Sequence, residues 1–201
     1  SSSSATIPNR AGRGNSSITG RVRATILFAA LALAGCQADR RVDPAEHQAF
    51  WLWGGIPPRD VLARAREIFL LDGEVLERGG KVVFRPLRPE PPRLPGKQLW
   101  LTVRTDTLDW PEPAHALLLR HLGQWRAAGN RVAGVQIDFD ATARRLERYA
   151  AFLRDLRRRL PPDAKLSITG LMDWSANGDP DQLARLEGIV DEVAIQTYQG
   201  R

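Results

Sequence analysis

From Ala49 onward, short apolar runs alternate with amphipathic stretches, and this rhythm constrains the fold more than any other feature of the chain. Parallel strands that are each followed by a crossover helix produce such a pattern. In the second half of the chain the apolar runs start about thirty residues apart, which is the length of one βα unit. The sequence therefore predicts an α/β fold with a parallel sheet.

The pattern predicts six strands separated by helices. The best-defined helix is expected over residues 143–160, because its apolar residues lie along one stripe and it ends at Pro161-Pro162. Other helices are expected over 60–71 and 114–128, and one begins at Pro180. The expected strands are 49–53, 81–85, 99–104, 132–139, 165–171 and 192–197.

Two architectures fit this order, an open doubly wound sheet and a (β/α)8 TIM-barrel-like fold. No G-x-G-x-x-G turn follows a predicted strand, which favours the barrel. A usual barrel has roughly 250 residues, so a chain of 201 residues is expected to hold only about six βα units and to be truncated. Such a wall leaves open strand edges, and the remaining alternatives are an unusual open sheet or a dimer that completes the wall.

The first part of the chain has the features of an export signal. Arg21 and Arg23 precede an apolar stretch, 24–32, that is too short to span a bilayer, and Leu33-Ala-Gly-Cys36 resembles the bacterial lipobox. We therefore expect a signal peptide over 1–35, whose upstream part is doubtful because translation is expected to start at Val22. Residues 36–48 are expected to be a lipidated Cys36 and its tether, and residues 49–201 a partial barrel domain in the cell envelope.

The charge of the chain argues against nucleic acid as a partner. The formal net charge is +6, but residues 1–35 contribute four arginines and no acid, which leaves 6 − 4 = +2 for the rest. A non-specific nucleic-acid binder needs a stronger basic surface. The only cysteine is Cys36, so no intramolecular disulfide can form.

The predicted strand 132–139 carries the main catalytic candidates. Alternation along a strand sends Gln136, Asp138 and Asp140 to the same side. Catalytic groups of β/α barrels lie at the carboxyl ends of the strands. Because two neighbouring carboxylates repel each other, the pKa of one of them should be raised, and that residue could act as a general acid. Capping of the following helix by these aspartates is the structural alternative.

At this strand the chain resembles the family 18 glycoside hydrolases, which include the chitinases. The similarity runs over 134–140, 149–154, 166–169 and 193–198. It implies that Asp138 orients the substrate, that Asp140 occupies the position of the proton donor, and that Tyr198 supports them. The sequence departs from the family at Gln136, which replaces an aspartate, and at Asp140, which replaces a glutamate. A second resemblance, to bacterial lipoproteins of domain-of-unknown-function family 3142, covers nearly all of 49–201 and implies no activity.

Polar and aromatic residues at other strand ends complete the expected cleft. Aromatic faces stack on sugar rings, and carboxylates with arginine bind hydroxyl groups. These side chains are expected to bind a glycan or another polar polymer, which Asp140 would cleave as the acid; a non-catalytic glycan-binding protein and an envelope scaffold are the alternatives. No cofactor or metal is expected, because His47, His115 and His121 are scattered, the last two at the surface or its boundary. The expected substrate-binding residues are Trp51, Trp53, Arg104, Asp106, Gln136, Asp173, Trp174 and Gln196.

Overall fold

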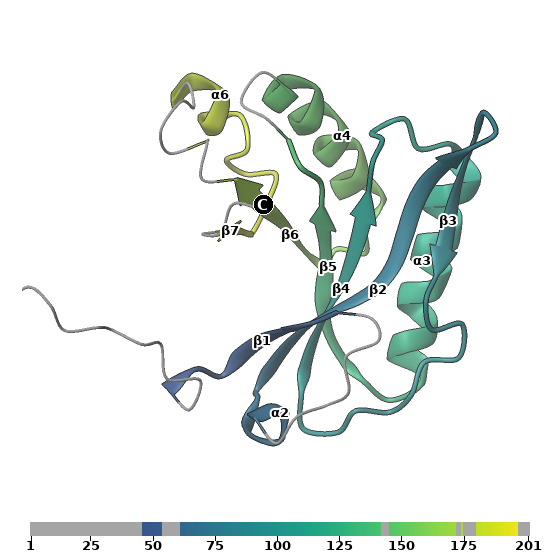
Figure 1. Ribbon diagram of the computed structural model, residues 1–201, viewed down its shortest axis with the longest axis vertical. Coiled ribbons are helices and arrows are strands. Elements are labelled where there is room, and N and C mark those ends of the chain that lie inside the picture. The colour runs from purple at the N-terminus through teal and green to yellow at the C-terminus, as the bar shows by residue number, and fades with distance from the viewer. Residues whose placement is uncertain (1–45, 54–60, 142–144, 172–173, 175–179, 197–201) are drawn as a thin grey trace, which may run out of the picture. The chain divides into compact units, whose positions relative to one another are not determined.

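The computed structural model describes residues 46–53, 61–141, 145–171, 174 and 180–196 (Figure 1). All described residues belong to one compact unit within Asp43–Arg201. The expected signal peptide, Cys36 and most of the expected tether lie outside the described residues. Across the described ranges, no helix combines the length and the apolar character needed to cross a membrane.

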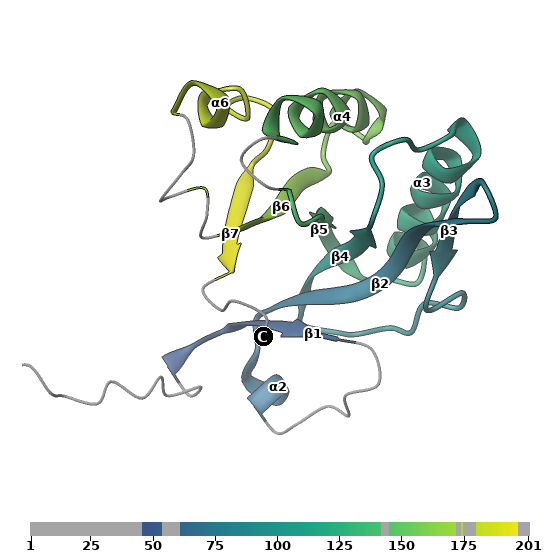
Figure 2. The same cartoon turned by 45° about the horizontal axis from the view of Figure 1, so that its top comes forward.

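One sheet contains six parallel strands that lie side by side in chain order, with an antiparallel seventh strand attached to the second. The sheet curves, with β1 and β7 at its two ends, and α3, α4 and α6 lie outside the curve (Figure 2). This is a half barrel that resembles a truncated TIM barrel, as the sequence predicted. The parallel strands are β1 (Ala49–Leu52), β2 (Glu67–Arg78), β4 (Gln98–Thr105), β5 (Arg131–Asp138), β6 (Lys165–Leu171) and β7 (Glu192–Gln196).

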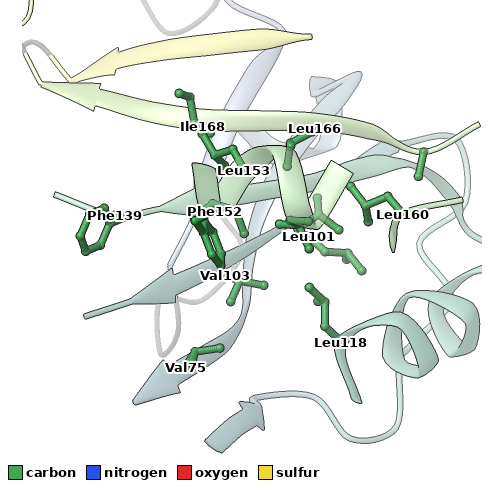
Figure 3. Packing of buried hydrophobic residues seen from close by; sticks show 14 of the residues in the cluster. Val75, Leu101, Val103, Leu118, Phe139, Phe152, Leu153, Leu160, Leu166 and Ile168 are labelled. Atoms are coloured by element: carbon green, nitrogen blue, oxygen red, sulfur yellow. The ribbon is translucent and has the colours of Figure 1, made fainter. Parts of the chain in front are cut away.

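The hydrophobic core lies between the sheet and the helices α3 (Glu112–Ala127) and α4 (Leu146–Arg159). Strand alternation directs Leu101 and Val103 of β4 to this side, where they meet helix residues such as Leu118 and Leu153 (Figure 3). A short helix, α6 (Pro180–Ala184), precedes β7. Because the helices take up the apolar positions, the opposite, inner face of the strands is free to carry polar groups.

The predicted helix over 60–71 is wrong. Only α2 (Val61–Arg64) is helical there, and β2 starts at Glu67. The run Ile68–Leu71 is buried at every position, and a continuous apolar run is typical of a parallel strand covered on both faces. The second strand of the barrel is therefore β2.

The segment predicted as the second barrel strand, 81–85, has a different role. It forms β3 (Lys81–Pro86), which pairs antiparallel with β2. The two strands meet at Gly79 and Gly80, whose φ angles are 56° and 72°. Glycine adopts these left-handed conformations without a steric penalty, so the pair permits a tight hairpin.

Strands β5 and β6 approach each other closely at Gly134. Gly134 is the register partner of Lys165, and a Cβ atom at Gly134 would collide with the Lys165 backbone. Only glycine fits at this position without a shift of one strand, so Gly134 sets how closely the strand that carries the candidate carboxylates packs against β6.

Candidate functional site

A pocket of about 190 Å3 opens on the inner face of the half barrel, toward the carboxyl ends of the strands. This is the end of a β/α sheet where ligands bind. Residues of β1, β4, β5, β6 and β7, together with Trp53 directly after β1, line it. Its aromatic and polar side chains are Trp51, Trp53, Thr102, Asp138, Thr169 and Gln196.

Asp138 is the acidic group of the pocket, and its side chain is almost closed off from solvent, with 7% exposed. Its Oδ1 accepts a hydrogen bond from Thr169 Oγ1 at 2.8 Å and one from Gln196 Nε2 at 3.3 Å. Burial raises the pKa of Asp138, and the charge of Asp140 adds to this, while the two hydrogen bonds and Arg104 act in the opposite direction. The pKa of one carboxyl group of the pair is thus raised in the expected direction, and that group is Asp138, but burial contributes more than the repulsion from which the expectation was argued.

Asp140 has a different environment. Strand β5 ends at Asp138, and Asp140 follows it with an exposed side chain that does not line the pocket. Its charge nevertheless reaches Asp138 and disfavours ionisation there. The two carboxyl groups are therefore neighbours with unequal solvation, one inside the pocket and one in solvent.

Gln136 is completely buried beneath the pocket. Its Oε1 accepts hydrogen bonds from Trp51 Nε1 at 3.0 Å and from Thr102 Oγ1 at 3.1 Å. Its Nε2 donates to Ser167 Oγ at 3.1 Å, and Ser167 Oγ donates to Glu192 Oε1 at 3.3 Å. The predicted inner-face position of Gln136 is thus confirmed, and its amide connects four strands.

Three aromatic rings stack along the inner face of β1, β2 and β4. The ring centroids of Trp51 and Phe69 are 4.6 Å apart with planes 20° from parallel, and those of Phe69 and Trp100 are 5.7 Å apart at 5°. The three residues are direct register partners. Trp51, at the open end of the stack, is 43% exposed, whereas Trp100 is 2% exposed.

Two predicted binding residues lie away from the pocket. Trp174 is buried, and its Nε1 donates to the carbonyl oxygen of Ala141 at 2.7 Å. Asp106 is exposed and lines a separate hollow with Arg145 and Arg148. Arg104 is exposed beside the pocket as the register partner of Asp138. Asp173 and Tyr198 lie outside the described residues.

Sequence reasoning missed Thr102 and Thr169 as pocket residues. Both occupy inner-face positions, two residues from other inner-face positions on their strands, so strand alternation could have identified them. Their hydroxyl groups bind the two polar inner-face side chains of β5, Gln136 and Asp138.

The described parts of the chain contain no group of three or more His, Cys, Asp and Glu side chains placed to hold a metal ion. The expectation that His115 and His121 lie at the surface or its boundary is wrong, because only 4% and 2% of them are exposed. Both lie on the face of α3 that packs against the core. Trp110 and Phe152 surround His115, and a buried carboxylate binds His121.

The fold and the pocket thus define a parallel half barrel with a polar and aromatic inner site. Residues 100–199, which include most of β4 and all of β5 to β7, match the model of a family described as Domain of unknown function (DUF3142). No curated protein sequence matches the chain.

Two solved structures have a distantly similar fold. The Bacillus cereus spore cortex-lytic enzyme SleL is 18% identical, with a TM-score of 0.47 over 67% of this chain and 35% of that chain. The chitinase domain of the Clostridium difficile spore coat protein CotE is 13% identical, with a TM-score of 0.49 over 82% of this chain and 52% of that chain. The chain therefore spans about a third and about half of these two structures.

Proposed function

We propose that this protein is a lipid-anchored protein of the cell envelope whose half barrel binds a glycan in the inner pocket and cleaves it by acid catalysis. The observation that carries the proposal is a single pocket in which Trp51 and Trp53 lie together with a buried carboxyl group, Asp138, of raised pKa. Aromatic faces with a few convergent polar groups are the mixture that a polar ring-shaped ligand requires.

The raised pKa supports Asp138 as the carboxyl group that carries the proton. A general acid must hold its proton near the working pH, and burial moves Asp138 in that direction. The family resemblance assigns the donor position to Asp140 instead. Asp140 is exposed outside the pocket lining, so its contribution in this proposal is the negative charge that disfavours ionisation of Asp138. Tyr198 keeps its proposed supporting role.

A second candidate function is non-catalytic glycan binding. The exposed position of Asp140 favours it, because the residue at the family's donor position does not reach into the pocket. A shift of about 1 Å at a reacting group can cost on the order of a hundredfold in rate. In that case the pocket and its aromatic residues would hold a glycan without cleaving it.

Hydrolysis assays separate these two functions. The protein is incubated with purified peptidoglycan and with soluble oligosaccharides of glucose and of N-acetylglucosamine, and the release of reducing ends is measured. We expect Asp138→Asn to abolish turnover of a responsive glycan and Asp140→Asn to reduce it only partly. Loss of turnover in Asp140→Asn with full activity in Asp138→Asn would reverse the two roles, and binding without turnover in the unsubstituted protein would identify a glycan-binding protein.

The lipid anchor is tested separately. A labelled fatty acid should be incorporated into the full chain when it is expressed in bacteria, and Cys36→Ser should abolish the label, because a thiol is the only acceptor that the lipobox-like segment offers. Ala34→Ser, which keeps a small residue before the cysteine, is the matched control and should still be labelled. Equal labelling of Cys36→Ser would contradict lipidation at this residue.

A further inference from the structure

The ring of Trp51 is held in place although 43% of the residue is exposed. Its Nε1 donates to Gln136 Oε1, and one of its faces stacks on Phe69. Phe69 in turn stacks on Trp100, which donates its own Nε1 to Glu67 Oε1 at 2.7 Å. An exposed indole fixed at one edge and one face loses little conformational freedom when a ligand stacks on its other face.

We infer that Gln136 is a positioning residue that sets the plane of Trp51 and thereby makes the free face of Trp51 a stacking platform for a sugar ring in the pocket. This inference rests on the proposed glycan function. It adds a subsite on β1 and assigns a role to the glutamine that stands where the resemblance places an aspartate. Gln136 has no exposed surface, so it acts on the ligand only through Trp51.

The amide of Gln136 is well suited to this role because each of its polar atoms is already engaged. The oxygen accepts from Trp51 and Thr102, and the nitrogen donates to Ser167. A buried amide held from three strands cannot rotate without losing hydrogen bonds that nothing nearby replaces. The orientation of Trp51 is therefore set before any ligand arrives.

The same hydrogen bond determines what Trp51 offers to a ligand. Because Nε1 donates to Gln136, Trp51 presents a π face and no free donor. The complementary ligand group is the apolar C–H face of a sugar ring, with the hydroxyl groups of that ring directed toward Asp138, Thr169 and Gln196. The platform therefore contributes stacking, and the opposite wall of the pocket contributes polar contacts.

Hydrogen exchange at the indole N–H of Trp51 tests the positioning role directly. The full 201-residue chain, labelled with 15N at its six tryptophans, is examined by NMR, and Trp51→Phe assigns the signal. We expect slow exchange at this indole despite its exposure. In Gln136→Met, which keeps the length of the side chain but has no amide, exchange should become about tenfold faster, the order expected for losing one hydrogen bond.

Two further variants separate positioning from general disturbance of the network. Ser167→Ala removes the acceptor of the Gln136 Nε2 while leaving Trp51 bound, so the Trp51 signal should stay protected. Gln136→Glu keeps an acceptor oxygen and should restore protection. The inference would be overturned if the Trp51 indole N–H of the unsubstituted protein exchanged as fast as that of a free indole. It would also be overturned if the exchange rate were the same in Gln136→Met.

Ligand titrations complete the test and keep the two proposals apart. Soluble β-linked oligosaccharides of glucose and of N-acetylglucosamine are added to the same labelled samples. We expect them to shift the Trp51 signal, and we expect Gln136→Met to bind on the order of tenfold more weakly. If Gln136→Met bound the oligosaccharides as tightly as the unsubstituted protein while its Trp51 indole N–H exchanged rapidly, the role of Trp51 as a stacking platform would be overturned. No binding of any oligosaccharide, together with a protected Trp51, would contradict the glycan function and leave only the contact between Gln136 and Trp51.

Discussion

The carboxylate of Asp72 and the imidazole of His121 are paired inside the protein and form an ion pair when His121 is protonated: Oδ2 and Nε2 are 2.7 Å apart, and each side chain is 2% exposed. Trp125 Nε1 also donates to Asp72 Oδ2 at 2.8 Å, and Gln124 Oε1 lies 3.1 Å from His121 Nδ1. Asp72 belongs to an irregularity in the pairing of β2 with β4. The pair therefore joins the sheet to α3 at the point where strand pairing shifts register.

The ion pair makes stability depend on pH. Burial alone would lower the pKa of His121, but the hydrogen bonds to Asp72 and Gln124 and the charge of Asp72 outweigh it, so the pKa is raised. A histidine whose folded pKa is raised stabilises the fold fully below its unfolded pKa of about 6.5, and this contribution is lost as pH rises through the folded pKa. Urea unfolding of the unsubstituted protein and of His121→Gln should therefore differ most at pH 6 and less at pH 8.

The expected loss in His121→Gln is about 1–3 kcal/mol of unfolding free energy at pH 6, because Asp72 loses a charged hydrogen-bond donor but keeps Trp125 and the Arg88 guanidinium 3.9 Å away. His115→Gln is the control with the opposite sign. Burial and the charge of Arg159 lower the pKa of His115, against the smaller effects of Asp155 and Glu112. Its neutral form is favoured in the fold, so its stabilising effect appears above pH 6.5. If the two substitutions changed the unfolding free energy with the same dependence on pH, the opposite pKa directions of His121 and His115 would be contradicted.

Asp138 should reduce stability at neutral pH. Its folded pKa is raised, chiefly by burial, so the fold prefers the protonated form, and stability is lost as pH rises above the unfolded pKa of about 3.9. Asp138→Asn should therefore have a higher unfolding free energy than the unsubstituted protein at pH 7 and a similar one at pH 3.5. Asp163→Asn, at a side chain that is 74% exposed, should show no such trend. Destabilisation by Asp138→Asn at pH 7 would refute the prediction.

Gly134→Ala should destabilise the protein by about 1–3 kcal/mol, the usual range for overpacking. The added methyl group would collide with the Lys165 backbone and force β5 and β6 apart. Gly123→Ala is the matched control, because its Cβ meets nothing within 4 Å and alanine is about 1 kcal/mol better than glycine inside a helix. Equilibrium denaturation should move the two variants in opposite directions.

Trp53 and Trp174 should respond differently to truncation. Trp174 is 3% exposed and donates a hydrogen bond to the carbonyl oxygen of Ala141, so Trp174→Ala should lower the unfolding free energy by about 3–5 kcal/mol. Trp53 lines the pocket, so Trp53→Ala should weaken glycan binding by roughly 1–3 kcal/mol, the scale of burying a large side chain. Thermal melting and calorimetric titration of both variants distinguish these outcomes. A fully stable Trp174→Ala that loses glycan affinity would return Trp174 to the binding site.

The sequence determined those features that depend on local backbone geometry. Strand alternation placed Gln136 and Asp138 on one face, because successive side chains of a strand point to opposite sides. The apolar stripe over 143–160 predicted α4, which spans Leu146–Arg159, because a helical period repeats within a single segment. The same reasoning failed for β2, since the run Ile68–Leu71 has no period that distinguishes a buried strand from a helix.

The tertiary structure decided which of these residues meet. The partners of Asp138, Thr169 and Gln196, lie 31 and 58 positions away in the chain, and Trp51 lies 85 positions from Gln136. The burial that raises the pKa of Asp138 exists only after the strands have curved around the pocket. Trp174 and His121 were misplaced for the same reason, because burial depends on elements distant in sequence. Local alternation therefore fixed the face of each side chain, and long-range packing fixed its neighbours and its chemistry.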